Sequence, residues 1–357
     1  MILAAGLLGV GGCNNSFVAP SMTQPQATAK FAYVANQVSG TLSGYAVDPS
    51  TGSLTPLSGF PIASGVNPNF VVHDPQQRFV IVADIAASLL RVYGIDSTTG
   101  MLTEVEPSPY VVEQEPRSLA IDPTGRFVYV TSQALNSVTA FAIDAEGVLT
   151  PVTGSPFPTG GSAAFGRCVV VHQTGKFLYV EDLDNVYAFG IDSSSGALSL
   201  INTVAGPTQG GGLALAPSGS FLYAVGSGSN SAAIFSIDPI TGVLTPSGTS
   251  PLALQDGAYT ISIDPSGQFA YTVEAGQTLV AYSLQNGGLT PLGEYSGALG
   301  SLQLAIDPSG SFVYAPQTGS ENNISGFRIG SSGILSALPG SPTPSGQGPL
   351  SITITSQ

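Results

Sequence analysis

The chain has no tryptophan, only two cysteines and few charged side chains, and each shortage narrows what the protein can do. Tryptophan is the usual surface on which a sugar ring stacks, so carbohydrate binding loses its ordinary platform. Lys and Arg number 8 among 357 residues, no two are adjacent, and the formal net charge is −14. Because nucleic acids and anionic membrane surfaces both require a basic footprint, we expect neither as a partner.

Glycine, proline and apolar residues are abundant instead. The counts of Gly (45) and Pro (27) suit many short strands joined by turns, and 43% hydrophobic residues are enough to form a core. The low charge therefore indicates a surface of Ser, Thr, Asn and Gln rather than a disordered chain.

The N-terminus reads as an export signal. Residues 1–12 are an apolar run that is too short to cross a bilayer and is typical of the hydrophobic part of a signal peptide. Val10-Gly11-Gly12-Cys13 resembles a lipobox, so we predict a signal peptide over 1–13 and lipidation of Cys13; an ordinary signal peptide with an incidental Cys13 is the alternative. Residues 14–29, rich in Ser, Thr, Pro, Gln and Ala, are then a flexible tether. We expect an exported protein, in the periplasm, in the outer membrane or at the cell surface, that touches the membrane only through its lipid.

The second cysteine, Cys168, is expected to lack a disulfide partner, whichever way Cys13 is processed. It is then a small buried hydrophobic residue.

An internal repeat dominates the rest of the chain. Its clearest copy runs from Arg117 to Pro151, with Ile-Asp-Pro-Thr-Gly at 121–125 followed by Phe-Val-Tyr-Val at 127–130. One phenylalanine opens the second strand of each unit, and successive ones are 43 to 50 residues apart: Phe31, Phe79, Phe127, Phe177, Phe221, Phe269 and Phe312. A period in the forties with four short strands per unit is typical of propeller blades. The sequence therefore predicts an all-β, seven-bladed β-propeller over residues 30–357.

Each unit is expected to supply four antiparallel strands. An apolar innermost strand such as 119–121 leads into an Asp-Pro-Ser/Thr-Gly turn, where Asp accepts from backbone amides, Pro presets φ and Gly supplies a positive φ. The alternating Phe-x-Tyr-Val strand follows, then a strand ending in Ile-Asp, a turn closed by Gly, and an outer Leu-Thr-Pro element such as 149–151. Proline fits an edge strand, because a missing N–H there costs no ladder bond.

The two ends of the repeat region predict how the ring closes. The first unit begins at Lys30 with its second strand, and the chain ends in an alternating strand, 349–355, that has no second strand after it. That last strand should complete the first blade and leave no open sheet edge in the ring.

These repeats resemble a known family. The Asp-Pro-Ser-Gly-x-Phe-x-Tyr segments look like those of the lactonase family of seven-bladed propellers, which includes bacterial 6-phosphogluconolactonase. Tyr-Val-Ala-Asn at 33–36 and Tyr-Val-Thr-Ser at 129–132 look like the Tyr-Val-Thr-Asn (YVTN) repeat of surface-layer propellers. The resemblance covers residues 30–357 and implies the same fold.

The resemblance also implies a catalytic set of His, Arg and Glu, which this chain does not have. Spacing places the family's histidine motifs at 164–167 and 210–212, its Glu at Ser227 and a further Arg at Ala275. The only histidines are His73 and His172, and a shift of one or two residues in this placement does not bring either of them to those positions. Lactone hydrolysis would therefore need a rearranged site.

Two other groups could carry chemistry. His172 takes the place of a turn Asp and His73 ends an innermost strand, so both are expected to be structural and no metal site is predicted. Glu181, Asp182 and Asp184 form the densest acidic cluster, which could bind a cation or serve acid–base chemistry; a solvated loop is the preferred interpretation.

Arg117 and Arg167 are the main candidates for ligand binding. Each lies eight residues before the turn glycine of its unit, so both enter innermost strands of adjacent blades at the mouth of the central channel. Two guanidinium groups there could grip a carboxylate or a phosphate bidentately. The equivalent positions in other blades are Tyr259 and Asn69. The alternative is that the arginines pair with local acids, Glu113 or Glu115.

The sequence thus predicts a monomeric cell-envelope propeller that uses no cofactor and serves as a binding or scaffold module for a small anionic ligand or an envelope protein. A lactone hydrolase with a rearranged site at the central channel is the first alternative. A surface repeat protein with a structural role is the second.

Overall fold

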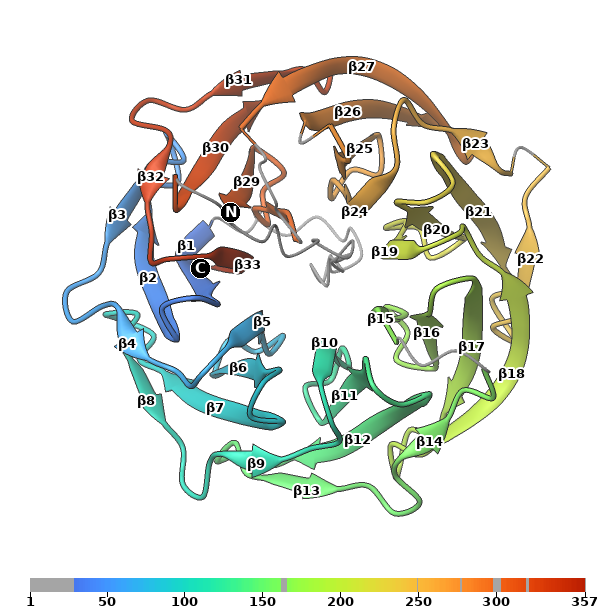
Figure 1. The fold of residues 1–357 in the computed structure, drawn as a ribbon, viewed down its shortest axis with the longest axis horizontal. Helices are drawn as coiled ribbons and strands as arrows, with labels where there is room; N and C mark the ends of the chain where they lie inside the picture. Colours follow the sequence, from blue (N-terminus) through green and yellow to red (C-terminus); the bar gives the residue numbers. More distant parts are fainter. Residues whose placement is uncertain are drawn as a thin grey trace, which may run out of the picture.

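The computed structural model describes residues 29–161, 166–248, 250–276, 278–297, 303–318 and 321–356. Over these residues seven antiparallel sheets stand as blades around a common centre, and no helix is present (Figure 1). The prediction of an all-β, seven-bladed propeller is confirmed. The predicted signal peptide, Cys13 and nearly all of the tether lie outside the described residues, and the first strand begins at Ala29 rather than at Lys30.

The strands of a blade follow one another from the centre outward. The innermost strands are β5 (Pro68–His73), β10 (Pro116–Ile121), β15 (Cys168–Val171), β19 (Gly210–Leu215), β24 (Ala258–Ile263), β28 (Ala305–Ile306) and β33 (Pro349–Ser356). The second strands are β1 (Ala29–Asn36), β6 (Phe79–Asp84), β11 (Phe127–Ser132), β16 (Phe177–Glu181), β20 (Phe221–Gly226), β25 (Phe269–Glu274) and β29 (Phe312–Gln317). The third strands are β2 (Thr41–Val47), β7 (Leu89–Ile95), β12 (Ser137–Ile143), β17 (Asn185–Ile191), β21 (Ser231–Ile237), β26 (Thr278–Gln285) and β30 (Asn323–Ile329).

The outer strand is more complex than the sequence predicts. In blades four and six it is continuous, as β18 (Leu198–Ala205) and β27 (Gly288–Ser296). In the other five it is split into two short pieces that both pair with the third strand. The pieces are β3 (Leu54–Pro56) and β4 (Ile62–Ala63), β8 (Leu102–Glu104) and β9 (Tyr110–Val111), β13 (Leu149–Pro151) and β14 (Phe157–Pro158), β22 (Leu244–Pro246) and β23 (Leu252–Ala253), and β31 (Leu335–Ala337) and β32 (Thr343–Pro344). The predicted Leu-Thr-Pro element is therefore the first piece of a longer edge.

The repeated phenylalanines hold each blade to the next. Each ring packs against a glycine in the turn between the third and outer strands of the following blade, and a Cβ on that glycine would lie 2.2–3.3 Å from the ring. The glycines have φ between 73° and 88°, so both conformation and space require glycine there. The seven pairs are Phe31–Gly100, Phe79–Gly147, Phe127–Gly196, Phe177–Gly242, Phe221–Gly287, Phe269–Gly333 and Phe312–Gly52.

The tyrosine two residues after the phenylalanine adds a hydrogen bond to the same glycine. In five blades its hydroxyl donates to the glycine carbonyl across the blade interface, over 2.7–3.3 Å. The donors are Tyr33, Tyr129, Tyr179, Tyr271 and Tyr314, all fully buried. The Phe-x-Tyr signature of the repeat is thus a contact between blades rather than within one.

The C-terminal strand closes the ring as predicted. β33 pairs antiparallel with β1, so the last residues of the chain form the innermost strand of the first blade. Two contacts join it to the second blade: the Ser351 hydroxyl accepts from the Val71 amide at 3.0 Å, and the Thr353 hydroxyl lies 2.6 Å from the His73 ring nitrogen Nδ1. Ile352 and Ile354 are buried in the core between blades seven and one.

The turn after each innermost strand uses its aspartate as expected. In the third blade Asp122 accepts from the amides of Arg126 and Phe127 at 2.7 Å, and Gly125 has φ 67°. His172 takes the same place in the fourth blade: its Nδ1 is 2.8 Å from the Thr174 hydroxyl and its Nε2 is 3.1 Å from the Gly219 carbonyl. The prediction that His172 is a turn residue is confirmed.

Cys168 is fully buried, as predicted, but the predicted lack of a disulfide partner is wrong. Its sulfur is disulfide-bonded, and the described residues contain no free cysteine. The same sulfur accepts from the Leu213 amide at 3.2 Å and so joins the innermost strands of the fourth and fifth blades.

Candidate functional site

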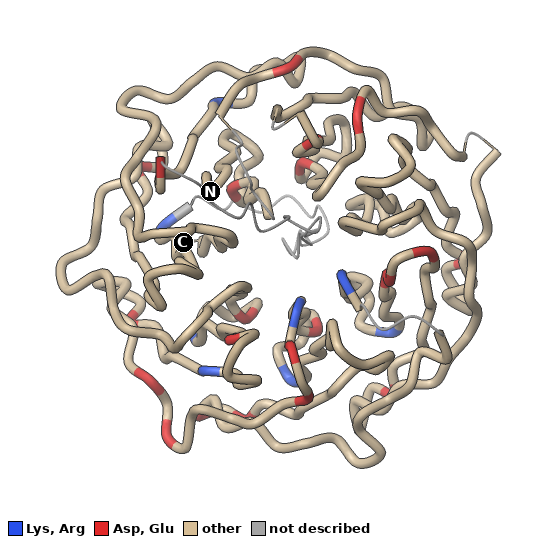
Figure 2. The backbone as a smooth tube through the Cα atoms, viewed as in Figure 1, with Lys and Arg blue, Asp and Glu red and all other residues tan. Residues whose placement is uncertain are grey.

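The sequence-predicted site residues lie at one end of the innermost ring. We call this end the mouth, and define it by Asn69, Arg117, Arg167, Gly211 and Tyr259. Asn69, Arg117, Gly211 and Tyr259 lie in β5, β10, β19 and β24, and Arg167 directly precedes β15. In Figure 2 the neighbouring blades of β10 and β15 present basic positions at the inner edge of the ring. The two arginines therefore come from adjacent blades, as the repeat spacing predicts.

Arg117 is held in place by its neighbour in the preceding blade. The Asn69 side-chain amide donates to the carbonyls of Pro116 and Arg117, both at 3.3 Å. Asn69 is 3% exposed and Arg117 is 6% exposed. Asn69 is thus a positioning residue, which fixes the backbone that carries the guanidinium group.

Burial and the like charge of a neighbouring arginine both lower the pKa of Arg117. Burial, followed by the charge of Arg167, lowers the pKa of Arg117 to about 9, and Glu115 acts in the opposite direction. A pKa of about 9 still leaves the side chain cationic at neutral pH. A like charge disfavours the protonated form of a neighbouring cation, which is the direction in which Arg167 acts on Arg117.

Arg167 interacts electrostatically with two groups, the Arg117 guanidinium and the buried carboxyl of Glu181. Its backbone amide donates to the Glu181 carbonyl at 2.8 Å. Partial burial lowers the pKa of the Arg167 side chain, and the charge of Glu181 raises it. An acid therefore acts on the pKa of each arginine, as the alternative interpretation predicts. The acid is Glu115 for Arg117, and for Arg167 it is Glu181, which that interpretation does not name. The other suggested acid, Glu113, accepts a hydrogen bond from the Ser137 hydroxyl.

The acidic cluster is not the solvated loop that the sequence favoured. Glu181 is 0% exposed and Asp182 is 4% exposed, and only Asp184 faces solvent. Asp182 is fully used as a loop cap: it accepts from the amides of Asp184 and Asn185 and from the Tyr187 hydroxyl, at 2.6–2.9 Å. Glu181 is different, because neither of its carboxyl oxygens has a hydrogen-bond partner among the residues that the structure describes. The sequence analysis names Glu181 as one of this cluster but does not predict its burial, although its place four residues after Phe177 is a signal.

Burial raises the pKa of Glu181 well above its ordinary value. The charge of Arg167 opposes this rise, and the charge of Asp182 adds to it. A buried carboxyl with a strongly raised pKa beside an arginine is a feature found at binding and catalytic sites.

Tyr259 lies at the mouth but not beside the two arginines. It is half-buried in the sixth blade, and Gly211 packs against its backbone: a Cβ on Gly211 would lie 3.1 Å from the Tyr259 Cα. The fifth blade, which contributes only glycine at this level, separates Tyr259 from Arg167. The structure thus brings Asn69, Arg117 and Arg167 together and leaves Tyr259 apart.

Two of the family's expected catalytic positions that the structure describes carry side chains without catalytic groups of the expected kind, Ser227 and Ala275. The Ser227 hydroxyl bonds to Gln209, and Ala275 donates its amide to the Gly257 carbonyl. His73 and His172 lie at the end of the innermost strands away from the mouth. Among the described residues, no three His, Cys, Asp or Glu side chains gather as a metal site would require.

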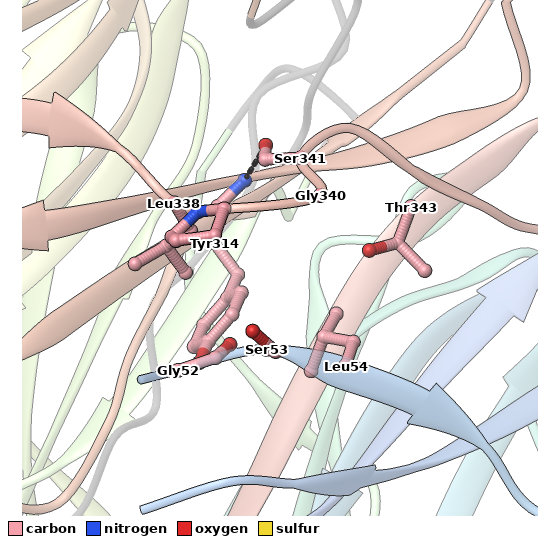
Figure 3. A pocket seen from close by; sticks show the side chains of 10 residues that line it. Gly52, Ser53, Leu54, Tyr314, Leu338, Gly340, Ser341 and Thr343 are labelled. Atoms are coloured by element: carbon pink, nitrogen blue, oxygen red, sulfur yellow. Dashed lines mark hydrogen bonds between the residues drawn. The ribbon is translucent and has the colours of Figure 1, made fainter. Parts of the chain in front are cut away.

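A pocket of about 270 Å³ lies at the seam between the last and first blades (Figure 3). Its lining includes Gly52, Tyr314 and Ser341. The Tyr314 hydroxyl is bonded to the Gly52 carbonyl, and the Ser341 hydroxyl accepts from the Gly326 amide at 2.9 Å. Because these polar groups are already satisfied, the pocket is a packing gap rather than a second site. In the described ranges no helix is long and apolar enough to cross a membrane.

Comparison with known proteins agrees with this architecture. The family model "Lactonase, 7-bladed beta-propeller" matches residues 24–114 and 70–258. No curated protein matches the chain. Among solved structures, a putative 6-phosphogluconolactonase from Bacteroides uniformis is 18% identical with a TM-score of 0.80, over 93% of this chain and 100% of that one. The periplasmic gluconolactonase PpgL of Pseudomonas aeruginosa is 19% identical with a TM-score of 0.76, over 91% and 98%. With the family model matching more than half of its length, the chain belongs to the lactonase family of seven-bladed β-propellers.

Proposed function

We propose that this propeller is a binding module that takes a small anionic ligand, a carboxylate or a phosphate ester, at its mouth. The observation that carries the proposal is the pair of arginines from adjacent blades at the mouth, of which Arg117 is buried and Arg167 half-buried, and whose like charges act on each other. Holding two like charges together in a poorly hydrated place costs free energy, and an anion between them offsets that cost. Arginine forks also match the planar oxygens of carboxylates and phosphates.

The surroundings of the pair support a site for a ligand. Asn69 fixes the backbone that carries Arg117 before a ligand arrives, and the Arg117 side chain is itself buried. Preorganised groups lose less entropy on binding. Glycines at 210–212 leave the neighbouring sector of the mouth without side chains.

We also propose that the protein is exported and works in the cell envelope. The support is the apolar run at residues 1–12, which is typical of a signal peptide, and the periplasmic location of the Pseudomonas relative. A lipid on Cys13 is not proposed, because Cys168 is disulfide-bonded, the chain has one other cysteine, and a lipidated sulfur cannot form a disulfide. Fractionation of cells that express the full chain would test export. Recovery in the periplasmic or envelope fraction is expected, and recovery in the cytoplasm would contradict the proposal.

A thermal-shift screen of the purified full chain would test ligand binding. A ligand at 100 times its Kd stabilises a protein by about 2.7 kcal/mol, so a binding carboxylate or phosphate ester should raise Tm by several degrees. The shift should vanish in Arg117→Ala/Arg167→Ala and persist in Arg126→Ala, a control at the opposite end of the blade, where Arg126 stacks on Phe127. A shift that survives the double substitution, or no shift with any anion, would contradict the proposal.

Lactone hydrolysis is the second candidate, and family membership favours it. Two guanidinium groups could stabilise the oxyanion that forms when water adds to a lactone carbonyl. Proton release from sugar and muconate-type lactones, measured by pH-stat, would decide between lactone hydrolysis and binding alone. Turnover above the spontaneous rate that is lost in the double arginine variant would make the protein an enzyme and replace the binding-module proposal.

A further inference from the structure

Glu181 is an exception in the repeat. It stands four residues after the phenylalanine that opens its blade's second strand. The residues at this place in the other blades are Ala35, Ala83, Thr131, Val225, Val273 and Pro316. The position faces the next blade and is otherwise small or apolar, so a carboxyl group there has no role in the general architecture.

The neighbouring blade makes room for this carboxyl. A Cβ on Gly210, at the start of β19, would lie 2.7 Å from both Cγ and Cδ of Glu181. The side chain therefore fills space that exists because residue 210 is glycine. It is 0% exposed, and within the described ranges no donor reaches either of its oxygens. A buried carboxylate without donors is costly, so its protonation state must depend on the charges around it.

Few charged groups act on Glu181. Arg167, directly before β15, favours the ionised form, and Asp182, next to Glu181 in sequence, favours the protonated form. The residues paired with it on the adjoining strands are Cys168 in β15, which is disulfide-bonded, and Val186 in β17. On the next blade, β19 places Gly210 against Glu181. Arg167 is thus the one cation that offsets a charge on Glu181, and it is also one of the two cations assigned to the ligand.

We infer that binding of an anion at Arg117 and Arg167 is coupled to uptake of a proton by Glu181. This inference rests on the proposed function of the same site. An anion that pairs with Arg167 cancels the positive field that favours the ionised carboxyl, and adds a negative charge nearby. Glu181 then takes a proton from solvent, so the site binds an acid, anion plus proton, rather than an anion alone.

Linkage gives this coupling a definite sign. Where Glu181 is ionised in the free protein and protonated in the complex, each unit rise in pH lowers the affinity by up to about tenfold. Below that range Glu181 is protonated in both states and the affinity is flat. Ligand binding should therefore weaken as pH rises.

The test is titration calorimetry of the full chain with sulfate and with gluconate, neither of which titrates near neutral pH. Each titration is run between about pH 5 and pH 8 in two buffers of different ionisation enthalpy, which gives the number of protons exchanged. The wild type should take up a fraction of a proton per anion bound, and Glu181→Gln should bind with no uptake. Glu274→Gln is the matched control, because Glu274 is also buried but accepts from the Asp256 amide and the Thr272 hydroxyl.

The outcomes separate this inference from the proposed function. Binding with no proton exchange and a pH-independent Kd would overturn the coupling and leave the anion site intact. Uptake that persists in Glu181→Gln would assign the proton to another group and also overturn it. Failure of both anions to bind would count against the site itself. If Glu181→Gln does not fold, the pH dependence of the wild-type Kd decides alone.

Discussion

The Tyr314 hydroxyl donates to the Gly52 carbonyl at 2.7 Å and joins the last blade to the first across 262 residues of sequence. Tyr314→Phe should lower the free energy of unfolding by about 1–2 kcal/mol, because the substitution removes a buried hydrogen bond and leaves a carbonyl without its donor. Chemical denaturation followed by fluorescence measures the change. Tyr223→Phe is the control, since Tyr223 occupies the same place in the fifth blade and, within the described residues, makes no hydrogen bond of this kind. Equal effects of the two substitutions would contradict the account.

The glycine beneath each phenylalanine should be irreplaceable for two separable reasons. Gly333 has φ 80°, and a Cβ there would lie 2.2 Å from the Phe269 ring, whereas Gly340 has φ 77° and nothing within 4 Å. Gly340→Ala should therefore cost only the conformational strain, about 1–2 kcal/mol. Gly333→Ala should cost clearly more, because Phe269 must also move. Comparable losses in thermal denaturation of the two variants would show that the close approach contributes nothing.

Removal of residues 349–357 should destabilise the whole ring rather than one blade. The deletion exposes the edge of β1 and removes Ile352 and Ile354 from a shared core. Loss of the cooperative thermal transition, or a fall in Tm of more than ten degrees, is the expected result. A synthetic peptide of residues 349–357, added in excess, should restore part of the loss. An unchanged transition without the peptide would show that the closing strand is dispensable.

His73 should make the protein less stable in mild acid. Burial lowers its pKa to about 4 from an ordinary value of 6.5, while Asp74 acts in the opposite direction. A lowered pKa means that folding favours the neutral ring, so this contribution is complete above pH 6.5 and is lost as pH falls toward 4. The loss should be about 1–3 kcal/mol. The difference in unfolding free energy between neutral pH and about pH 4 should shrink in His73→Gln; the same difference in both proteins would show that His73 is not the group responsible.

The fold was predictable because its signals repeat. Six of the seven phenylalanines are the first residue of their blade's second strand, and Phe31 is the exception because β1 begins at Ala29. The orphan strand at 349–355 identifies the closing blade. The split of the outer strand was not visible, because its second piece is only two residues long in every case. Short pairings of this kind are fixed by the third strand beside them and leave no period in the sequence.

The site was predictable only in part. Position in the repeat placed Arg117 and Arg167 in adjacent blades, but it assigned Tyr259 to the same site although a blade separates them. The sequence pattern favours a solvated loop for Glu181, because it stands beside Asp182 and Asp184. Its burial follows from Gly210 on the next blade, a contact between positions that only the closed ring brings together. Departures from the repeat at one register position are the signal that could have found it.

The central claim is that an anion lies between Arg117 and Arg167. A crystal structure of the full chain with the anion that gives the largest thermal shift tests it most directly. The account predicts density for the anion at the mouth, with oxygen atoms within hydrogen-bond distance of both guanidinium groups. An anion bound elsewhere, or a mouth in which Arg117 and Arg167 turn away from it, would contradict the account.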